Sequence, residues 1–476
     1  MPAPRRLFGT NGIRGVVNKE LTPNFCARVG LAVGTYFGGG DILIGRDARL
    51  SGPMIASAVI SGLLAAGCRV FDAGLAPTPA LQYAVKHLGM DGGVIITASH
   101  NPPEYNGIKV LRPDGVELSR EQEKEVEAIF FESRFKPAAW HAVGSLRRLE
   151  GIVEAYVKGV EEHVDRELIA RRRFKVVLDP ANGVGVLPAL PLLRDLGCKV
   201  VLLNGEIDGR FPGRSPEPKP ENLGRLAAIT RASGASLGVA YDGDADRAIF
   251  VDELGHVRWG DESFALVIKW FLARRPGELV VTPVSSSSLI SDVVEACGGK
   301  LVWTPVGSVV VSHKMMELQA KLGGEENGGI FYGPHQPVRD GPMSTALILQ
   351  ILAEEHRPLS TLMDELPRYH LAKASVRCPH ELKPAALDIL RAKFKHVRLT
   401  TVDGVRVWYD DGSSVLMRPS GTEPIFRIYA EARDEERLRE VLAEHVALVR
   451  EAVEEAMRRA GGVERSGEGE GAGGRA

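Results

Sequence analysis

The chain has 476 residues, with 59 lysines and arginines against 61 aspartates and glutamates, and a formal net charge of −2 at pH 7. This balance argues against a protein that binds nucleic acid through its phosphates, because such proteins present a basic surface. Hydrophobic residues make up 44% and charged residues 25% of the chain, values that are typical of globular proteins and exclude a mainly disordered chain. At about 100–200 residues per domain, the length predicts three or four domains.

The five cysteines are scattered along the chain and odd in number. They form no CxxC pair and lack the close spacing of a disulfide framework, so a reducing compartment is expected. The amino terminus has no apolar signal core, and the longest apolar stretch, from Phe264 to Ala273, is short and contains Lys269. The sequence therefore predicts a cytoplasmic protein without an export signal or a membrane span.

A strand, helix, strand pattern occurs three times along the chain. Apolar strands joined by helices are typical of buried parallel sheets. The first strands are expected at residues 42–47, 176–180 and 279–283, and the second strands at residues 69–72, 199–203 and 300–303. A Gly-Cys or Cys-Gly pair precedes each second strand, and Cys68, Cys198 and Cys297 are interpreted there as small apolar packing residues.

After residue 370, polar and apolar residues alternate, which indicates half-buried antiparallel strands of a smaller α+β domain. The alternating segments are residues 405–410, 414–418 and 426–431, with a turn at Asp411-Gly412. Residues 434–460 have the spacing of an amphipathic helix, and the Gly, Glu and Arg residues that follow have almost nothing to bury. The predicted organisation is domains at 1–150, 151–256, 257–368 and 369–460, then a disordered tail at 461–476.

The first motif with chemical content is Thr-Ala-Ser-His-Asn-Pro at residues 97–102, which follows a buried strand. Ser99 and His100 are therefore expected at the carboxyl end of that strand, where open α/β sheets bind ligands. The alternative is a turn held by side-chain hydrogen bonds, which would be preferred for this segment in isolation. A Ser-His-Asp hydrolase is disfavoured because Ser99 lacks the flanking glycines of a nucleophile elbow.

Asp242, Asp244 and Asp246 occupy alternate positions of a glycine-containing turn between two apolar strands. Crowded carboxylates repel one another unless a cation neutralises them, and oxygen ligands suit Mg²⁺ or Ca²⁺. An EF-hand would explain Glu253 at the twelfth position, but Arg247 replaces the required glycine and the flanking segments are strands. The turn is interpreted as a metal site, with a solvated acidic turn as the alternative.

Two further segments could bind a polar ligand. Gly-Gly-Glu-Glu-Asn-Gly-Gly at residues 323–329 offers hydrogen-bond donors and acceptors that match vicinal hydroxyls. In isolation it would be read as a mobile surface turn. Arg-Pro-Ser-Gly-Thr-Glu-Pro at residues 418–424 combines a guanidinium, two hydroxyls and a glycine, which favours an anion site over a decorated hairpin turn.

Together with Leu-Phe-Gly-Thr-Asn-Gly-Ile-Arg-Gly at residues 7–15, these four motifs resemble the α-D-phosphohexomutase superfamily of phosphoglucomutases and phosphomannomutases, and the likeness extends to Ala432. The resemblance implies a four-domain, heart-shaped α/β fold. Three related α/β domains with mixed or parallel sheets and a C-terminal α+β domain would each contribute a loop to a central cleft. It also implies that phosphate moves between C1 and C6 of a hexose, through a phosphoserine enzyme and a hexose 1,6-bisphosphate that is intermediate and activator.

The resemblance assigns Ser99 as the phosphoserine. It implies that Asp242, Asp244 and Asp246 bind Mg²⁺ and that the phosphate on Ser99 completes the metal's ligands. The substrate-binding residues that it implies are Gly307, Glu325, Asn327, Arg418, Ser420, Gly421 and Thr422, of which the last four belong to the loop that holds the non-reacting phosphate.

Proton transfer requires a general acid and base near Ser99. The candidates by position are Arg14, His100 and Lys109. A lysine can serve if burial and cationic neighbours lower its pKa. Lys109 is favoured for this role, Arg14 and Arg247 are expected to stabilise charge, and His100 is expected to orient the loop.

The substrate-binding loop departs from many bacterial members of the superfamily, since Asn327 and Gly329 stand where a serine and a terminal histidine are common. In this respect the chain resembles archaeal members, some with loose sugar preference. The predicted function is a phosphomannomutase or phosphoglucomutase that acts on small phosphosugars, with neither nucleic acid nor membrane as partner. The alternatives are a phosphoglucosamine mutase, a phosphatase with Asp242 as nucleophile, and a non-catalytic protein that binds Ca²⁺ or sugar. The sequence does not indicate an oligomeric state.

Overall fold

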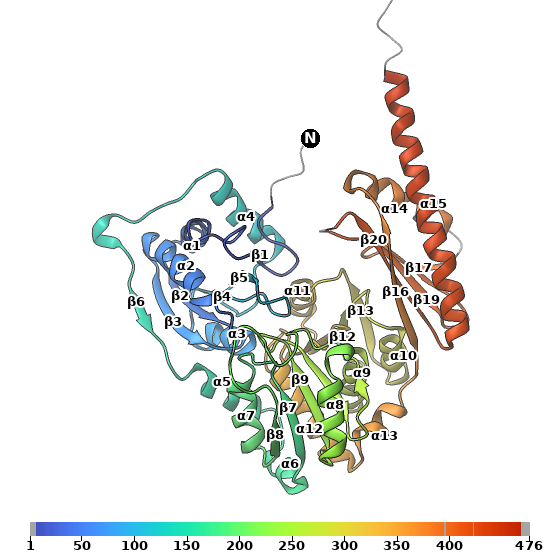
Figure 1. Ribbon diagram of the computed structural model, residues 1–476, viewed down its shortest axis with the longest axis horizontal. Helices are drawn as coiled ribbons and strands as arrows, with labels where there is room; N and C mark the ends of the chain where they lie inside the picture. The colour runs from blue at the N-terminus through green and yellow to red at the C-terminus, as the bar shows by residue number, and fades with distance from the viewer. Residues whose placement is uncertain (1–5, 395–396, 422, 468–476) are drawn as a thin grey trace, which may run out of the picture. The chain divides into compact units, whose positions relative to one another are not determined.

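The computed structural model describes residues 6–394, 397–421 and 423–467, with side chains described up to Ala460 (Figure 1). The chain forms two compact units. The first comprises the described residues up to Thr282 together with 293–302 and 307–366, and the second comprises 283–292, 303–306 and the described residues from Pro367 onward. Among the described residues, no helix combines the length and the apolar character that crossing a membrane requires.

The first sheet is mixed and has helices on both faces (Figure 1). Its elements are β1 (Ile13–Val16), α1 (Pro23–Phe37), β2 (Asp41–Arg46), α2 (Gly52–Ala65), β3 (Arg69–Leu75), α3 (Thr78–His87), β4 (Gly92–Ile96), β5 (Tyr105–Leu111), α4 (Arg120–Phe131), the 3₁₀ turn Trp140–Ala142 and β6 (Leu146–Arg148). The strand order is β1-β5-β4-β2-β3-β6, with β2 parallel to β3 and β4, and β5 antiparallel to β1 and β4. Ile42 and Ile44 pack with α1, α2 and α4, whereas Leu43 packs with α3, as the two-residue period of a strand requires.

Helices α1 and α2 lie against each other at two glycines. A Cβ on Gly30 would lie 2.2 Å from the backbone oxygen of Val59, and a Cβ on Gly62 would lie 2.1 Å from that of Ala27. Both distances are far shorter than any van der Waals contact, so a side chain at either position would force the two helices apart.

The second sheet has the order β11-β10-β9-β7-β8. Its elements are α5 (Ile152–Glu161), α6 (Arg166–Arg172), β7 (Lys175–Asp179), α7 (Val186–Asp195), β8 (Lys199–Leu202), the 3₁₀ turn Pro220–Asn222, α8 (Gly224–Ala232), β9 (Leu237–Tyr241), β10 (Ala248–Asp252) and β11 (Val257–Arg258). Strand β7 is parallel to β8 and β9, and β10 is antiparallel to β9 and β11.

The third sheet has the order β13-β12-β14-β15, with β12 parallel to β14 and β14 antiparallel to β15. Its elements are α9 (Gly260–Arg274), β12 (Leu279–Pro283), α10 (Ser288–Ala296), β13 (Lys300–Thr304), α11 (Ser308–Leu318), β14 (Leu322–Gly324), β15 (Ile330–Tyr332), α12 (Gly341–Glu355) and α13 (Leu359–Asp364). The first three sheets thus repeat one arrangement, in which a parallel strand is followed by an antiparallel neighbour: β4 and β5, β9 and β10, β14 and β15.

The C-terminal sheet is antiparallel throughout, in the order β16-β20-β19-β18-β17. Its elements are β16 (His370–Arg377), the 3₁₀ turn His380–Leu382, α14 (Lys383–Lys393), β17 (Arg398–Thr400), β18 (Val405–Trp408), β19 (Ser414–Pro419), β20 (Ile425–Ala432) and α15 (Glu435–Gly467). Helix α15 extends beyond residue 460, where a disordered tail was predicted to begin, and residues 468–476 of that tail lie outside the described residues.

A buried ion pair joins this sheet to residues 283–292 within the second unit. Arg406 and Glu431 are 3% exposed each and form a short ion pair. Arg406 also donates to the backbone oxygens of Val284 and Ser286 at 2.8 and 2.6 Å. Glu431 accepts a hydrogen bond from the Ser287 hydroxyl at 2.8 Å. A buried pair tolerates its desolvation only when its remaining donors and acceptors are satisfied, as they are here by residues before α10.

The structure confirms the fold class inferred from the sequence. The three predicted strand, helix, strand units are β2-α2-β3, β7-α7-β8 and β12-α10-β13, and the alternating segments after residue 370 form the antiparallel strands β18, β19 and β20. The predicted turn at Asp411-Gly412 is present, with the amide of Gly412 donating to the backbone oxygen of Tyr409 at 3.1 Å. The five cysteines are free thiols.

The contact between α1 and α2 predicts that Gly62→Ala destabilises the first unit. The new Cβ would overlap the backbone oxygen of Ala27, and overpacking of this kind costs about 1–3 kcal/mol. Calorimetry should show a melting temperature several degrees below that of the unsubstituted protein. The matched control is Gly224→Ala in α8, where a Cβ meets nothing within 4 Å, and it should leave the melting temperature unchanged or slightly raised. Equal stability of the two variants would contradict the prediction.

Candidate active site

Ser99 lies in the turn between β4 and β5 and is fully buried. Its φ of 51° is in the left-handed region, which costs a residue with a Cβ about 1–2 kcal/mol. The amide of Ser99 donates to the Thr97 hydroxyl at 2.9 Å, and the Ser99 hydroxyl donates to Asp242 Oδ2 at 2.6 Å. Such strain persists only where the surroundings impose it, so the turn holds the Ser99 hydroxyl in one orientation, toward the acidic turn.

Arg49 fixes the serine turn from its buried side. The guanidinium donates to the backbone oxygens of Ser99, Asn101, Pro102 and Tyr105 at 3.0, 2.5, 2.6 and 2.8 Å. Its Nε donates to Asp47 Oδ2 at 3.1 Å, and the Thr97 hydroxyl donates to the same oxygen at 2.6 Å. Arg49 and Asp47 were not predicted to support the site. The available signal was the polar segment that follows β2, at the sheet edge where the carboxyl ends of parallel strands meet.

Asp242, Asp244 and Asp246 lie on the turn between β9 and β10 and are at most 1% exposed. One oxygen from each lies within 4.8 Å of the oxygens from the other two. The structure therefore brings the three predicted metal ligands together, with the Ser99 hydroxyl in contact with the first of them.

Asp244 and Asp246 each have one oxygen that accepts a hydrogen bond and one that does not, an arrangement that suits a divalent cation. Asp244 Oδ2 accepts a hydrogen bond from the Thr78 hydroxyl at 2.6 Å, and Asp246 Oδ2 accepts one from Arg339 at 2.5 Å. The Oδ1 atoms of both aspartates are buried without a hydrogen-bond partner, which is costly unless a cation satisfies them. Since Mg²⁺ prefers oxygen ligands of this type, the residues fit a magnesium site.

The pKa values of the acidic turn reflect the same crowding. Burial, together with the negative charges of Asp246 and Asp244, raises the pKa of Asp242 well above its ordinary value. Burial also opposes ionisation of Asp244, but Lys109 and the Thr78 hydroxyl outweigh it and lower the pKa of that carboxyl. The turn therefore carries full negative charge only where enough positive charge is present.

Lys109, on β5, is a buried cation beside the acidic turn. Its Nζ lies 3.4 Å from an oxygen of Asp244, 3.4 Å from one of Asp246 and 3.5 Å from one of Glu117. Burial alone would lower the pKa of Lys109, but these carboxylates outweigh it and raise that pKa. The direction differs from the lowered pKa on which its proposed acid–base role was based, because three carboxylates surround the ammonium.

Two arginines and a histidine complete the surroundings of Ser99. Arg14 Nη1 donates to the Asn101 side chain at 2.5 Å, while its Nε and Nη2 are buried without a partner. Arg247 Nε is likewise buried without one. His100 Nδ1 lies 3.3 Å from the Ser99 hydroxyl oxygen, and Arg247, burial and Arg14 together lower the pKa of His100, which keeps the ring neutral. Unused guanidinium donors of this kind suit an incoming phosphoryl group.

The loop at 324–329 joins β14 to β15 and packs against the start of β10. The amide of Ala248 donates to the backbone oxygen of Gly328 at 3.0 Å. Glu325 is 3% exposed and accepts a hydrogen bond from Arg339 Nη1 at 3.2 Å, and Asn327 Oδ1 is buried without a partner. Because Arg339 also contacts Asp246, the predicted sugar loop and the acidic turn lie next to each other in the first unit.

Gly307 precedes α11 with a φ of 142°. A Cβ at this position would lie 3.3 Å from Thr10, and the adjacent Ser308 donates its hydroxyl to Asn11 Oδ1 at 3.0 Å. The start of α11 is thus in contact with the amino-terminal motif that contains Arg14.

The loop at 418–424 belongs to the second unit. Arg418 Nη2 lies 2.9 Å from an oxygen of Asp403, and Arg418 Nε is buried without a hydrogen-bond partner. Lys383 donates from Nζ to the backbone oxygens of Ser420 and Glu423 at 2.5 Å each. Lys383, the first residue of α14, was not predicted, because no sequence pattern relates the start of that helix to this loop. Around Gly421 a Cβ would meet nothing within 4 Å, and Thr422 lies outside the described residues.

Sequence models of one family match most of the chain. They are the phosphoglucomutase/phosphomannomutase alpha/beta/alpha domains I, II and III and the C-terminal domain, which match residues 5–137, 154–255, 259–369 and 374–448.

Several proteins are similar over nearly their whole length. A protein of Thermococcus kodakarensis described as a phosphoglucomutase/phosphomannomutase is 45% identical over 94% of this chain and 99% of its own length. A protein of Sulfurisphaera tokodaii described as a phosphoglucosamine/phosphogalactosamine mutase is 46% identical over 90% of this chain and 96% of its own. The crystal structure of a phosphoglucomutase/phosphomannomutase family protein from Burkholderia thailandensis matches with a TM-score of 0.85 and 31% identity, over 94% of this chain and 97% of that one. The chain belongs to the phosphoglucomutase/phosphomannomutase family of the α-D-phosphohexomutase superfamily, whose members are phosphate-transferring isomerases.

Proposed function

We propose that the protein is a phosphohexomutase that interconverts the 1-phosphates and 6-phosphates of mannose, glucose or both, through a phosphoserine at position 99. The observation that carries this proposal is the 2.6 Å hydrogen bond from the strained, buried Ser99 to Asp242, one of three clustered carboxylates. The name of the relative from Thermococcus kodakarensis supports the choice of hexoses.

In the proposed reaction, the bond between phosphorus and Ser99 Oγ breaks as a bond forms to the free hydroxyl oxygen of the hexose phosphate. The hydroxyl proton passes to a base, and the product is a hexose 1,6-bisphosphate. The intermediate then turns around, and its other phosphoryl group returns to Ser99 while that sugar oxygen regains a proton. Added bisphosphate would therefore also activate an enzyme that has lost its serine phosphate.

Phosphoryl transfer depends mainly on positioning and on neutralisation of charge. Arg49 and Thr97 hold the serine turn, and the unused donors of Arg14 and Arg247 would bind oxygens of the moving group. Mg²⁺ held by Asp242, Asp244, Asp246 and the serine phosphate would neutralise the negative charge of the phosphoryl group.

For proton transfer we keep Lys109 as the proposed acid–base group, since its Nζ is buried next to Asp244 and Asp246. As an ammonium it would first give a proton to the Ser99 oxygen as the bond to phosphorus breaks, and it would take that proton back when Ser99 attacks the other phosphoryl group. His100 would orient the serine loop, and its Nδ1 lies 3.3 Å from the Ser99 oxygen.

Recognition of the two ends of the substrate would be divided between separate loops. Glu325, Asn327 and Gly307 are proposed to bind the sugar, because the first two present buried polar groups beside the acidic turn. Arg418, Ser420, Gly421 and Thr422 are proposed to hold the non-reacting phosphate, and the unused Nε of Arg418 supports this role.

The five free cysteines are in keeping with a cytoplasmic location, which we also propose.

A second candidate is phosphoglucosamine mutase, and the relative from Sulfurisphaera tokodaii favours it. An aspartate-based phosphatase with Asp242 as the nucleophile is a more distant alternative, which needs no phosphoserine.

The mutase proposal predicts that Ser99→Ala lowers kcat at least about a thousandfold, because the residue that carries the phosphoryl group is gone. Mass spectrometry of the purified protein should find a phosphoryl adduct on Ser99, and dialysis against EDTA should abolish activity until Mg²⁺ is restored. The control is Ser61→Ala on the exposed side of α2, which should leave kcat unchanged. A phosphatase would instead release phosphate in Ser99→Ala and lose activity only in Asp242→Asn.

The choice of sugar is predicted to appear in kcat/KM. With Mg²⁺ and a catalytic amount of bisphosphate, glucose 1-phosphate and mannose 1-phosphate should react with kcat/KM values within about tenfold of each other, because the two sugars carry the same hydroxyls and differ only in configuration at C2. Glucosamine 1-phosphate is the third substrate to compare. If kcat/KM for the amino sugar exceeded both others by about a hundredfold, phosphoglucosamine mutase would replace our assignment.

A further inference from the structure

Arg339 lies between the sugar loop and the acidic turn and is 4% exposed. One terminal nitrogen, Nη2, donates to Asp246 Oδ2 at 2.5 Å, and the other, Nη1, donates to Glu325 Oε2 at 3.2 Å. A single planar cation thus bridges two carboxylates to which the proposed function gives different tasks, one toward the metal ion and one toward the hexose. Arginine suits this place because its nitrogens form a rigid fork, whereas the ammonium of a lysine is a single point.

Gly329 provides the space that Arg339 occupies. A Cβ at position 329 would lie 2.5 Å from Cδ and 2.7 Å from Cγ of Arg339. The stem of Arg339 therefore occupies the space that the side chain of any residue other than glycine would need at position 329. The two positions therefore depend on each other: glycine at 329 leaves room, and the stem of Arg339 fills it.

The backbone at Arg339 is held firmly. Its neighbour Asp340 accepts a hydrogen bond from the amide of Met343 at 2.9 Å, which caps the start of α12. The amide of Asp340 donates to the backbone oxygen of Ile330 at 3.1 Å. Gln336 donates to Asp340 Oδ2 at 2.9 Å and to the backbone oxygen of Pro79 at 3.1 Å. These bonds tie the segment to β15 and to α3, so the direction of the Arg339 side chain is set by the fold.

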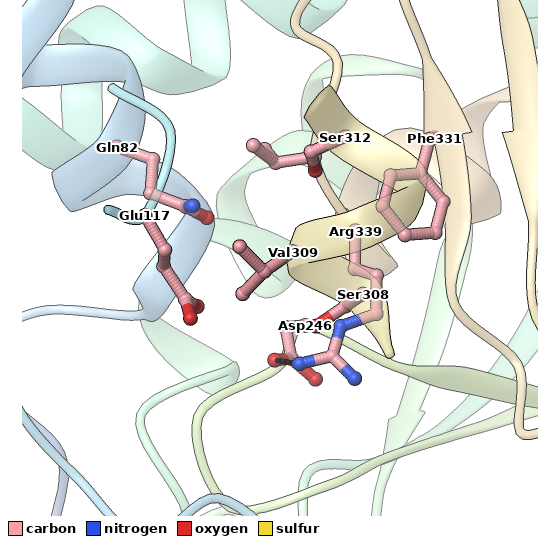
Figure 2. Close-up of a pocket in the computed structure, with 9 residues that line it drawn as sticks. Gln82, Glu117, Asp246, Ser308, Val309, Ser312, Phe331 and Arg339 are labelled. Carbon is pink, nitrogen blue, oxygen red and sulfur yellow. Dashed lines mark hydrogen bonds and ion pairs between the residues drawn. The ribbon is translucent and has the colours of Figure 1, made fainter. Parts of the chain in front are cut away.

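A small polar cavity lies on the other side of Arg339. Figure 2 shows the guanidinium against Asp246, with Glu117 and Gln82 across the cavity from it. The cavity measures about 10 Å³, which is room for about one water molecule. Arg339 is therefore enclosed by protein, and its charge acts on Asp246 and Glu325 with little screening by solvent.

We propose that Arg339 is a positioning residue that couples recognition of the hexose to the metal-binding turn, and that Gly329 is required to make room for it. This assignment rests on the proposed function. Because Arg339 donates to both Glu325 and Asp246, it fixes the position of the sugar loop relative to the metal ligands. Its positive charge also lies next to a metal ligand and opposes binding of the cation.

These two effects have opposite signs, which makes the proposal testable with Arg339→Met. Loss of the charge should tighten binding of Mn²⁺, measured by electron paramagnetic resonance without substrate, by at least about threefold. Loss of the anchor for Glu325 should raise KM for glucose 1-phosphate and mannose 1-phosphate by at least about tenfold. Arg339→Lys should keep the Mn²⁺ affinity within about twofold of the unsubstituted protein, but KM should stay raised because lysine lacks the two separate nitrogens that donate to Asp246 and Glu325.

The pairing of residues 329 and 339 is tested by a double-mutant cycle. Gly329→Ala should raise KM with little change in Mn²⁺ affinity, since the charge remains but is displaced. In an Arg339→Ala background the same substitution should add nothing, because the clash has been removed. Ser312→Ala, which alters another side chain lining the same cavity, is the control and should change neither quantity.

Weaker Mn²⁺ binding together with raised KM and a lowered melting temperature in Arg339→Met would reduce Arg339 to a packing residue and overturn the proposal. Unchanged values of both quantities, or additive effects in the double-mutant cycle, would overturn it as well. Failure of the proposed function is a separate outcome. In that case the unsubstituted protein would not isomerise hexose phosphates at all, whereas the Mn²⁺ titration would still report the effect of the Arg339 charge.

Discussion

Neutralising the buried carboxylates of the acidic turn is the constraint on which the first unit depends. Asp242, Asp244 and Asp246 present oxygens within 4.8 Å of one another and are almost completely removed from solvent. Burying even one unpaired carboxylate is prohibitively costly. The chain meets this constraint with Lys109 from β5 and Arg339 from the segment before α12. Since each cation comes from a different part of the sequence, the acidic turn is compatible only with the assembled unit.

Backbone hydrogen bonds from two helices also place positive charge at the acidic turn. The amide of Thr78, at the start of α3, donates to the backbone oxygen of Asp244 at 3.0 Å, and the amide of Gly341, at the start of α12, donates to that of Ala245 at 3.1 Å. Two helix amino termini are thus directed at one turn, and each brings partial positive charge. The first three sheets place Ser99, Asp242 and Glu325 after corresponding strands, β4, β9 and β14, each followed by an antiparallel neighbour. Repetition of one sheet therefore yields three related loops, which carry Ser99, the acidic turn and Glu325.

Much of the fold and of the loops could be predicted from the sequence, because both depend on local patterns. Apolar runs determine the first strands of the three repeats, and alternation identifies the C-terminal strands. Arg339 and Lys383 could not be predicted, because their partners are distant in sequence or are backbone atoms, and for Arg49 the signal was limited to the polar segment after β2. Arg339 is 93 residues away from Asp246 along the chain, and Lys383 donates to carbonyl oxygens of the loop at 418–424. The raised pKa of Lys109 has a similar origin, since two of the carboxylates that raise it, Asp244 and Asp246, lie far from Lys109 along the chain.

The position of Arg339 also bears on how a loop motif is interpreted. A loop with glycine at 329 has no cation of its own, and its motif gives no sign of a cation from elsewhere in the chain. In the folded chain the aliphatic stem of Arg339 lies against Gly329, and its guanidinium donates to Glu325 of that loop. The positive charge beside this loop therefore comes from a segment outside the motif. The net charge of a chain likewise does not describe its site. A chain with a formal charge of −2 can bind anionic sugars when its cations surround one turn, because unscreened interactions at short range outweigh the effect of the net charge.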